Sequence, residues 1–251
     1  MELSKRLTGV ASMVSLHAKV ADIGCDHGFV SIYLIGNRIA DKVIAMDVNE
    51  GPLKRAREHI KEAGLDAYIE TRLSDGGAAL APGEADTAII AGMGGRLMVH
   101  ILSEAAERSL HFKELVLQPQ SEIFKVREYL WSNGYEIIAE DMVFEDGKYY
   151  QIMKAVVGKS DMEVKIHDFA KLTGFAEEIV REAFLCYGLQ LLKESHPVCL
   201  DYLQYEKENA GRIRQHIMKQ KETPETVRRL RELQHKLNVL QCAVEVGETV
   251  W

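Results

Sequence analysis

The chain has 251 residues, of which 47% are hydrophobic and 27% are charged, and its formal net charge is −7. These proportions are those of a globular protein and exclude a disordered or fibrous chain, while the length allows one large domain or one domain with an appendage. The negative net charge argues against an affinity for nucleic acid spread over the whole surface.

Short apolar runs alternate with helical patterns through the first 157 residues. The apolar runs predict five strands, at 19–24, 42–48, 67–75, 85–92 and 113–119. Helices are predicted after four of these strands, at 29–38, 52–63, 96–105 and 121–134. The segment 135–158 predicts two more strands around the turn signal Asp146-Gly147. Strands separated by helices indicate an α/β fold, with a mainly parallel sheet covered on both faces and an antiparallel hairpin at its end.

The character of the sequence changes after Gly158, because nothing from there to Trp251 predicts a strand. Pro197 and Pro224 begin helical segments, the second after Thr223, a suitable N-cap. Apolar residues recur at spacings of three and four in the last two helices: Leu203, Ala210, Ile213, Ile217, Val227, Leu230, Leu233, Leu237, Leu240 and Val244. We therefore expect two domains, 1–158 and 159–251, the second an all-α, coiled-coil-like helical hairpin whose seam is internal packing rather than a partner site.

No stretch of about 18 apolar residues is present, and the N-terminus lacks the apolar core of a signal peptide. The four cysteines (Cys25, Cys186, Cys199 and Cys242) are scattered without metal-type spacing. We expect a cytoplasmic protein with reduced thiols, no metal and no membrane contact.

The loop after the first strand, "DIGCDHG", combines a glycine turn with polar side chains. In an open parallel sheet, ligands bind beyond the carboxyl ends of the strands, which is where this loop lies. Gly24 and Gly28 allow a close backbone approach to a ligand and a sharp turn into a helix. The loop lacks the third glycine of a dinucleotide fingerprint and carries Asp22 and Asp26, which suit a ligand with an ammonium and a sulfonium and would repel a pyrophosphate.

The next strand ends carry further acids and glycines. Asp47 ends the second strand about twenty residues after the first loop, where an acid binds ribose hydroxyls; the alternative role, a helix N-cap, is served equally well by Asn49. Asp75, in "LSDGG", is placed to accept from an adenine amino group, and "AGMGG" follows the fourth strand. Each feature alone is usually a turn, but together they predict a cofactor crevice.

Several motifs follow one another in residues 4–157: "RLTGVASMV", "VADIGCDHGFVSIYL", "AMDVNEGPL", "RLSDG", "AIIAGMGG" and "LVLQPQSEIFKVREYLWSNGYEI". With these motifs, the segment resembles the bacterial tRNA (adenine-N1)-methyltransferases called TrmK, which modify adenine 22. The strand order is also that expected of a class I, Rossmann-like methyltransferase. The resemblance implies methyl transfer from S-adenosyl-L-methionine, leaving S-adenosyl-L-homocysteine, to N1 of an adenine in the D-loop region of tRNA. It also implies a C-terminal helical domain that binds tRNA.

The resemblance carries roles onto residues of this chain. With their neighbours in the same loops, the candidate cofactor contacts are Asp22, Gly24, Cys25, Asp26, His27, Gly28, Asp47, Val48, Asn49, Ser74, Asp75, Gly76, Ala91, Gly92 and Met93. The candidate catalytic residues are Asp26, His27, Gly94 and Gly95, and contacts to the target are expected from Gly94, Gly95, Gln118, Pro119 and Gln120. The Cys25 side chain is expected to pack against the sheet, and His27 either contacts the base, handles a proton or pins the loop.

The segment after the fourth strand suggests which atom of the base is methylated. Many enzymes that methylate an exocyclic amine carry an Asp/Asn-Pro-Pro-aromatic motif there, whereas this chain has "AGMGG", which favours a ring nitrogen. Adenine N1 has an in-plane lone pair and no proton to lose, so no strong general base is required. Tyr149, Tyr150 or Phe144 could stack on an unstacked adenine, although hairpin aromatics are more often core residues.

Positive charge is concentrated near the C-terminus. Residues 211–236 hold eight Lys and Arg against three Glu, a net charge of +5. A solvated helix face explains such a run as well as an RNA contact does; with the resemblance, we expect Arg212, Arg214, Arg228 and Arg229, together with Lys5 and Arg6, to contact phosphate.

Two alternatives remain open from the residues alone. One is a small-molecule methyltransferase whose helical domain is a lid or dimerisation element, and the other is a non-catalytic RNA-binding sensor of S-adenosylmethionine. No obligatory protein partner is evident, so a monomer or weak dimer is expected.

Overall fold

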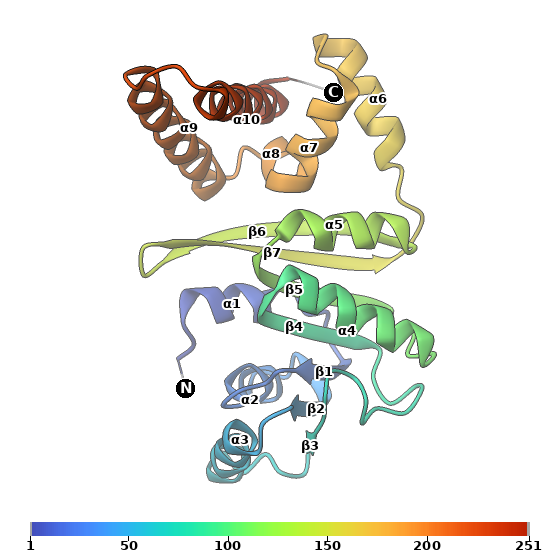
Figure 1. Cartoon of the computed structure of the whole chain (residues 1–251). Coiled ribbons are helices and arrows are strands. Elements are labelled where there is room, and N and C mark those ends of the chain that lie inside the picture. The colour runs from blue at the N-terminus through green and yellow to red at the C-terminus, as the bar shows by residue number, and fades with distance from the viewer. Residues whose placement is uncertain (1, 250–251) are drawn as a thin grey trace. The chain divides into compact units, whose positions relative to one another are not determined.

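Seven strands form one sheet within residues 2–249, the part of the chain that the computed structural model describes (Figure 1). The strand order is β3-β2-β1-β4-β5-β7-β6. The first five strands in this order are parallel, and β7 and β6 add an antiparallel hairpin. The strands are β1 (Ala18–Ile23), β2 (Ala40–Asp47), β3 (Ile69–Leu73), β4 (Thr87–Gly94), β5 (Glu114–Ser121), β6 (Tyr135–Glu145) and β7 (Lys148–Val157).

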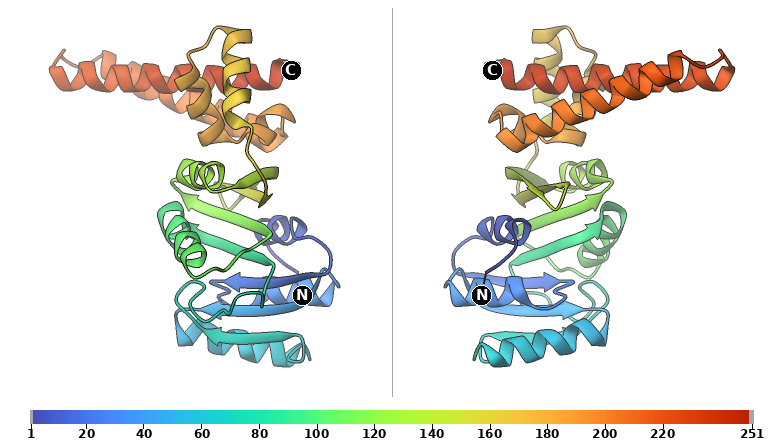
Figure 2. Two further views of the ribbon diagram at one scale, coloured as in Figure 1. Left: turned by 90° about the vertical axis from the view of Figure 1, so that its right-hand side faces the viewer. Right: turned by 90° about the vertical axis from the view of Figure 1, so that its left-hand side faces the viewer.

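Helices cover both faces of this sheet (Figure 2). The cluster on one face takes its helical residues from α1 (Lys5–Ser12), α2 (Phe29–Gly36) and α3 (Glu50–Glu62), and that on the other from α4 (Gly95–Glu107) and α5 (Ile123–Ser132). Neighbouring residues of one strand point into opposite clusters, since Ile89 of β4 faces the first and Ile90 faces the second. Both side chains are fully buried, which explains why the strands are continuous apolar runs rather than alternating patterns.

The predicted α/β fold with its terminal hairpin is confirmed, and the structure adds two features. An N-terminal helix, α1, begins where the Ser4 side chain accepts a hydrogen bond from the Leu7 amide. The glycine-rich segment after the fourth predicted strand is not a free loop: β4 continues to Gly94, and the pairing with β5 is irregular around Gly92, whose φ is +82°. This positive φ lets the strand bulge while it stays paired.

The remaining residues form a second, all-helical unit that begins at Asp161, while the first unit ends at Ser160. Its helices are α6 (Met162–Thr173), α7 (Glu177–Tyr187), α8 (Leu189–Lys193), α9 (Pro197–Met218) and α10 (Pro224–Glu248). The Thr223 side chain accepts from the Thr226 amide in a capping box, so the predicted N-cap of the last helix is confirmed.

Helices α9 and α10 lie against each other as a hairpin, as the apolar spacing predicted. Leu203, Ala210, Ile217 and Leu240 are buried in the packing. The prediction was wrong for Ile213, which is 41% exposed although its spacing matched the seam. Helix α10 is buried most heavily near its C-terminal end, where it also contacts α7 and α8.

None of the helices within residues 2–249 is both long enough and apolar enough to span a bilayer.

Candidate functional site

A cavity of about 510 Å³ lies at the carboxyl ends of β1, β2 and β4. Its volume is within the usual range for a small-molecule site. Most of the predicted cofactor residues line it: Asp22, Gly24, Cys25, Asp26, His27, Asp47, Val48, Asn49, Ser74, Asp75, Gly76, Ala91, Gly92 and Met93. Segments distant in sequence therefore meet at this edge of the sheet because parallel strands end there together.

The loop after β1 has three residues with positive φ before α2. Gly24 and Gly28 have φ values of +78° and +73°, and Asp26 between them has φ +50°. A side chain at Gly24 would collide with Met93 Cε, and one at Gly28 would press on the Ala56 Cβ at 3.2 Å. The glycines thus serve the turn and the close packing, while Asp26 occupies a backbone position that Asp tolerates better than most residues.

Asp22 is an almost fully buried acid in the wall of the cavity, 4% exposed. Burial raises its pKa to about 6, and the negative charge of Asp47 adds to this, although the Ser31 hydroxyl partly offsets it by donating to Asp22 Oδ2 over 2.6 Å. A positively charged ligand beside Asp22 would remove this cost.

The Asp47 carboxylate links the loop after β1 to the loop after β2 by hydrogen bonds. Its Oδ2 accepts from the Asp26 amide at 3.3 Å and its Oδ1 from the Asn49 amide at 2.8 Å. Asn49 stands at the N-cap position of α3 but makes no capping hydrogen bond through its side chain. Asp47 therefore holds the loop after β1 in place and also lines the cavity.

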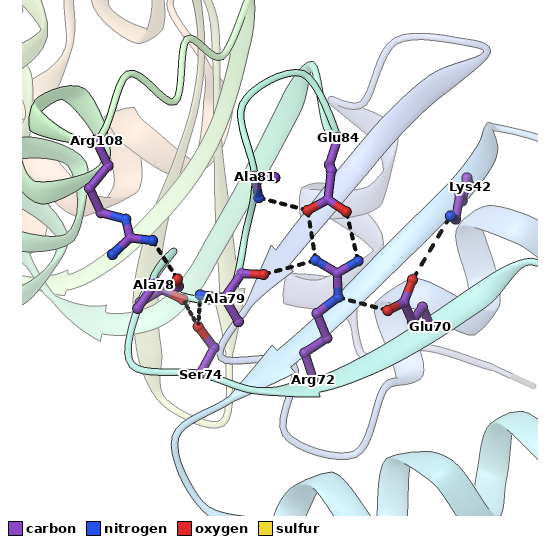
Figure 3. Close-up of polar contacts among 10 residues, drawn as sticks. Lys42, Glu70, Arg72, Ser74, Ala78, Ala79, Ala81, Glu84 and Arg108 are labelled. Atoms are coloured by element: carbon purple, nitrogen blue, oxygen red, sulfur yellow. Dashed lines mark hydrogen bonds and ion pairs between the residues drawn. The ribbon is translucent and has the colours of Figure 1, made fainter.

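The loop after β3, which carries Asp75, is tied down by ion pairs (Figure 3). Arg72 donates from Nη1 and Nη2 to the Glu84 carboxylate at 2.7 and 2.9 Å and from Nε to Glu70 at 2.7 Å. These donations hold the pKa of Glu84 down at about 2. Ser74 Oγ donates to the Gly76 carbonyl and accepts from the Ala79 amide, so its hydroxyl shapes the loop.

His27 has partners within the protein at both ring nitrogens. Its Nδ1 accepts from Arg55 Nε at 3.3 Å, and its Nε2 is 3.6 Å from Asp26 Oδ1. The ring stacks on Phe29, which in turn stacks on His59, with centroids 5.4 and 5.1 Å apart. These contacts are those of a residue that pins the loop, one of the roles left open for His27.

Cys25 is buried, in keeping with the expectation that its side chain packs against the sheet. Burial, with smaller contributions from Asp22 and Asp47, raises the pKa of the thiol well above its ordinary value. The Cys25 side chain packs in the same core cluster as the buried residues of α2. Cys25 also lines the cavity, because it belongs to the loop after β1.

Gly94 and Gly95 do not line the cavity. Gly95 begins α4, and a Cβ there would lie 2.5 Å from the Glu122 carbonyl oxygen and 2.7 Å from that of Ser121. Its lack of a side chain is therefore required for the start of α4 to pass the end of β5. A catalytic role for these two glycines stays a prediction.

The candidate target contacts fall into two groups. Arg6 and Gln120 line the cavity, whereas Lys5, Gln118 and Pro119 do not. Gln118 is fully buried and accepts a hydrogen bond from Arg6.

The hairpin aromatics also lie outside the cavity lining. Phe144 and Tyr149 contact each other near the hairpin turn, with ring centroids 4.6 Å apart, and Tyr150 lies under the Arg6 guanidinium. None of the three aromatic side chains lines the cavity, so their role as a stacking platform for a base stays a prediction.

The four arginines predicted to contact phosphate in the second unit are exposed near the turn of the α9–α10 hairpin. Arg212 and Arg214 lie late in α9, and Arg228 and Arg229 lie early in α10. Arg228 lies 3.7 Å from Glu232.

Several cavity residues were missed from the sequence: Leu7, Ile23, Phe29, Val30, Pro52, Leu97 and Ile101. All are apolar or proline and lie within seven residues of a predicted site residue, so proximity to the motifs was the available signal. Leu97, in the first turn of α4, is 48% exposed.

Chemically, the cavity is an acidic, partly apolar site. Asp22, Asp47 and Asp75 are spread along the ends of three strands, with apolar side chains between them. Within residues 2–249 no cluster of three or more His, Cys, Asp or Glu is arranged to hold a metal ion. The arrangement suits a nucleoside ligand that carries positive charge.

Residues 3–153 match the family described as "Methyltransferase domain". The chain is 31% identical to the tRNA (adenine(22)-N(1))-methyltransferase of Bacillus subtilis over 98% of this chain and 99% of the relative. The crystal structure of that organism's m1A22 tRNA methyltransferase TrmK covers 97% of this chain and 99% of its own, with a TM-score of 0.80. A Streptococcus pneumoniae structure solved in complex with S-adenosyl-L-methionine has a TM-score of 0.79 at 28% identity and covers 97% of this chain and 100% of its own. With the predicted motifs gathered around one cavity and a relative matched from end to end, the chain belongs to the tRNA (adenine(22)-N(1))-methyltransferase family.

Proposed function

We propose that this protein transfers a methyl group from S-adenosylmethionine to N1 of adenine 22 in tRNA. The observation that carries the proposal is the acid-lined cavity at the strand ends of a chain that matches a tRNA (adenine(22)-N(1))-methyltransferase over nearly its whole length.

The cavity residues fit the cofactor. Asp22, buried with a raised pKa, gains a cation to neutralise it, and Asp47 stands where an acid binds ribose hydroxyls. Asp75 is the candidate acceptor for the adenine amino group. Gly24 leaves room for the Met93 side chain, which lines the same cavity and would collide with a Cβ at that position.

When bound, S-adenosylmethionine supplies an electrophilic methyl group on a sulfonium sulfur. The S–CH₃ bond breaks as the N1–CH₃ bond forms, and the positive charge passes from sulfur to the adenine ring. Because N1 offers its lone pair directly, the chain has no proton to remove before attack. Its task is to align N1 with the methyl group and exclude water, an effect that can contribute up to about 7–11 kcal/mol.

The helical unit supplies the RNA contact in this proposal. Eight basic residues against three acidic ones lie in residues 211–236, and the exposed turn end of the α9–α10 hairpin carries most of them. A few phosphate contacts suffice on one face of a folded tRNA, because RNA is recognised largely by shape. The tRNA substrate and the four free cysteines favour the cytoplasm as the site of action.

The direct test is methylation of two tRNA transcripts that differ only at position 22. With labelled S-adenosylmethionine, we expect label in the transcript with adenine 22, recovered as 1-methyladenosine by mass spectrometry, and none in the transcript with guanine 22. Label on N6, on another adenine, or equal label in both transcripts would contradict the proposal. Cofactor and tRNA binding without turnover would favour a non-catalytic sensor, and methyl transfer only to a free metabolite would favour a small-molecule enzyme.

A further inference from the structure

A second groove, of about 530 Å³, lies at the turn end of the α9–α10 hairpin and shares no residue with the cofactor cavity. This end of the hairpin extends beyond the other helices of its unit (Figure 2). The lining includes two apolar residues at the end of α9 and four residues from the first part of α10: Ile217, Met218, Val227, Leu230, Arg231 and Gln234.

The groove exists because the apolar seam of the hairpin is not closed at this end. Leu240, far from the turn, is 1% exposed. Val227 and Leu230 belong to the same spacing pattern nearer the turn and are only half-buried, while Met218 is 63% exposed. Single exposed apolar side chains are common on protein surfaces, but apolar side chains gathered along one groove are typical of a binding surface.

The rim of the groove is positively charged. Arg231 lines it, and Lys219 and Lys221 lie in the turn beside it, all three exposed. Within residues 2–249 none of these three cations takes part in an ion pair, although one acid, Glu222, also lines the groove. The surplus of cations complements an anionic partner and would repel the same end of a second copy of the chain.

An unstacked base of an RNA chain matches this combination of an apolar groove and a cationic rim. A phosphate group would need the cations but not the apolar lining, whereas a base has flat apolar faces, a polar edge and a phosphate on either side. The Arg231 guanidinium can stack on a base, and the Gln234 amide can hydrogen-bond to its edge. Met218 adds a flexible, polarizable side chain that adapts to an aromatic ring.

We propose that the groove at the turn of the α9–α10 hairpin binds an unpaired, unstacked base of the tRNA substrate. The inference rests on the proposed function, because its ligand is the same tRNA. It adds an apolar contact to the phosphate contacts expected of this unit, and it makes the turn end of the seam a binding surface, where the sequence predicted internal packing.

The first experiment separates the apolar contact from the phosphate contacts by their salt dependence. Filter binding of a tRNA with adenine 22 compares the wild type with Met218→Gln and Arg231→Gln at several salt concentrations. We expect Met218→Gln to weaken binding by about 2–10-fold at every concentration with an unchanged slope, because no charge is lost. Arg231→Gln should weaken binding and also reduce the slope of the logarithmic salt dependence by about 1.

Leu200→Gln is the matched control, because Leu200 is an apolar residue of the same helix that is 43% exposed and lies outside the groove. It should leave both the affinity for tRNA and the slope unchanged. Normal tRNA affinity in Met218→Gln, or an equal loss in Leu200→Gln, would overturn the inference.

The second experiment identifies the bound base. Unpaired nucleotides of the same tRNA are replaced by abasic residues, one in each RNA. One replacement should weaken wild-type binding by about 2–10-fold but change the binding of Met218→Gln by less than about twofold, because the variant has already lost that contact. Equal losses in the two proteins for every abasic tRNA would overturn the inference.

Two further outcomes separate the alternatives. A wild-type dimer in sedimentation that Met218→Gln dissociates, with tRNA affinity unchanged, would assign the groove to a second copy and overturn the inference. Because these are binding measurements, a wild type that binds tRNA but methylates none would overturn the proposed function alone. A wild type that binds no tRNA would overturn both.

Discussion

Asp22 shows how a single residue can be costly to the fold and useful to the ligand. Its carboxylate is buried beside Asp47, and its pKa is raised to about 6 from an ordinary 3.8. A raised pKa means that the folded state binds the proton more tightly than the unfolded state does. The fold of the free protein is therefore destabilised as the pH rises from about 4 to 6, and the cost is complete above that range.

The first prediction concerns Asp22→Asn. At pH 7.5 the variant should be more stable than the free wild type, by about 2–3 kcal/mol for a shift of roughly two pKa units, and the difference should shrink toward pH 4.5. Urea unfolding at the two pH values checks this. The same variant should bind S-adenosylmethionine more weakly, and wild-type binding should weaken below about pH 6 as Asp22 is protonated. Equal stability of the two proteins at pH 7.5 would mean that the buried Asp22 carboxylate does not destabilise the free protein.

The second prediction concerns Asp47, which accepts two backbone amides and lines the cavity. Asp47→Ala should lose about 1–3 kcal/mol of cofactor binding and also lower the melting temperature, because the amides of Asp26 and Asn49 lose their acceptor. Calorimetry and thermal unfolding separate the two effects. The control is Asp41→Ala, which removes an exposed acid of the same strand and should leave binding unchanged. Normal cofactor affinity in Asp47→Ala would show that the crevice is misassigned.

At the scale of elements, the loop after β3 owes its position to residues outside the cavity. Arg72 on β3 pairs with Glu84 and also donates to the Ala79 carbonyl at 2.8 Å (Figure 3). Glu84 in turn accepts from the Ala81 amide at 2.7 Å. These contacts close the loop on both sides of Asp75. Because the pKa of Glu84 is lowered, its contribution to stability is present at neutral pH and is lost as the pH falls from about 4.5 toward 2.

The third prediction concerns Arg72 and this loop. Arg72→Met should weaken binding of S-adenosylhomocysteine by about 3–10-fold, as expected for a loop that must be ordered on binding, although Arg72 does not touch the cavity. Because the loop carries the candidate adenine contact, the affinity for adenosine should fall in the same proportion, which calorimetry measures. The control is Arg57→Met, which removes an exposed arginine of α3 paired with Glu50. No change in adenosine affinity would exclude a positioning role for Arg72.

The elements also show where sequence patterns were sufficient. Buried parallel strands such as β4 and β5 were found because their apolar runs are continuous, and the Thr223–Pro224 start of α10 was found from its cap. Helix α1 was missed although Ser4 precedes Leu7, Val10 and Ala11 at helical spacing. A helix of two turns is too short for periodicity to stand out, and packing on the core decides whether it forms.

At the scale of the whole molecule, we propose that the first unit binds the cofactor and the second unit binds the RNA. The cavity is lined by residues of the first unit, and the exposed arginines cluster at the turn end of the α9–α10 hairpin. Changes to these arginines should therefore alter tRNA binding without altering cofactor binding.

The fourth prediction tests that division. Arg212→Gln/Arg214→Gln should weaken tRNA binding and reduce the slope of its logarithmic salt dependence by about 1–2, while leaving S-adenosylhomocysteine affinity unchanged. Filter binding at several salt concentrations gives the slope. Lys171→Gln/Lys193→Gln removes two exposed cations of the same unit from outside residues 211–236 and should leave the slope unchanged. Equal effects of the two variants would assign the RNA affinity to net charge rather than to the turn end of the hairpin.

The sequence by itself determined the α/β class, the hairpin at the end of the sheet, the helical second unit and the strand-end motifs, because these depend on local periodicity and on turns that glycine and acids encode within a few residues. Only the tertiary structure decided that Arg6 reaches Gln118, 112 residues away, that Arg72 holds the loop of Asp75, and that Ile213 is exposed at the seam. The physical reason is that contacts between distant segments depend on how helices and strands pack. The spacing of residues along the chain determines neither which distant residues come into contact nor which side chains are buried.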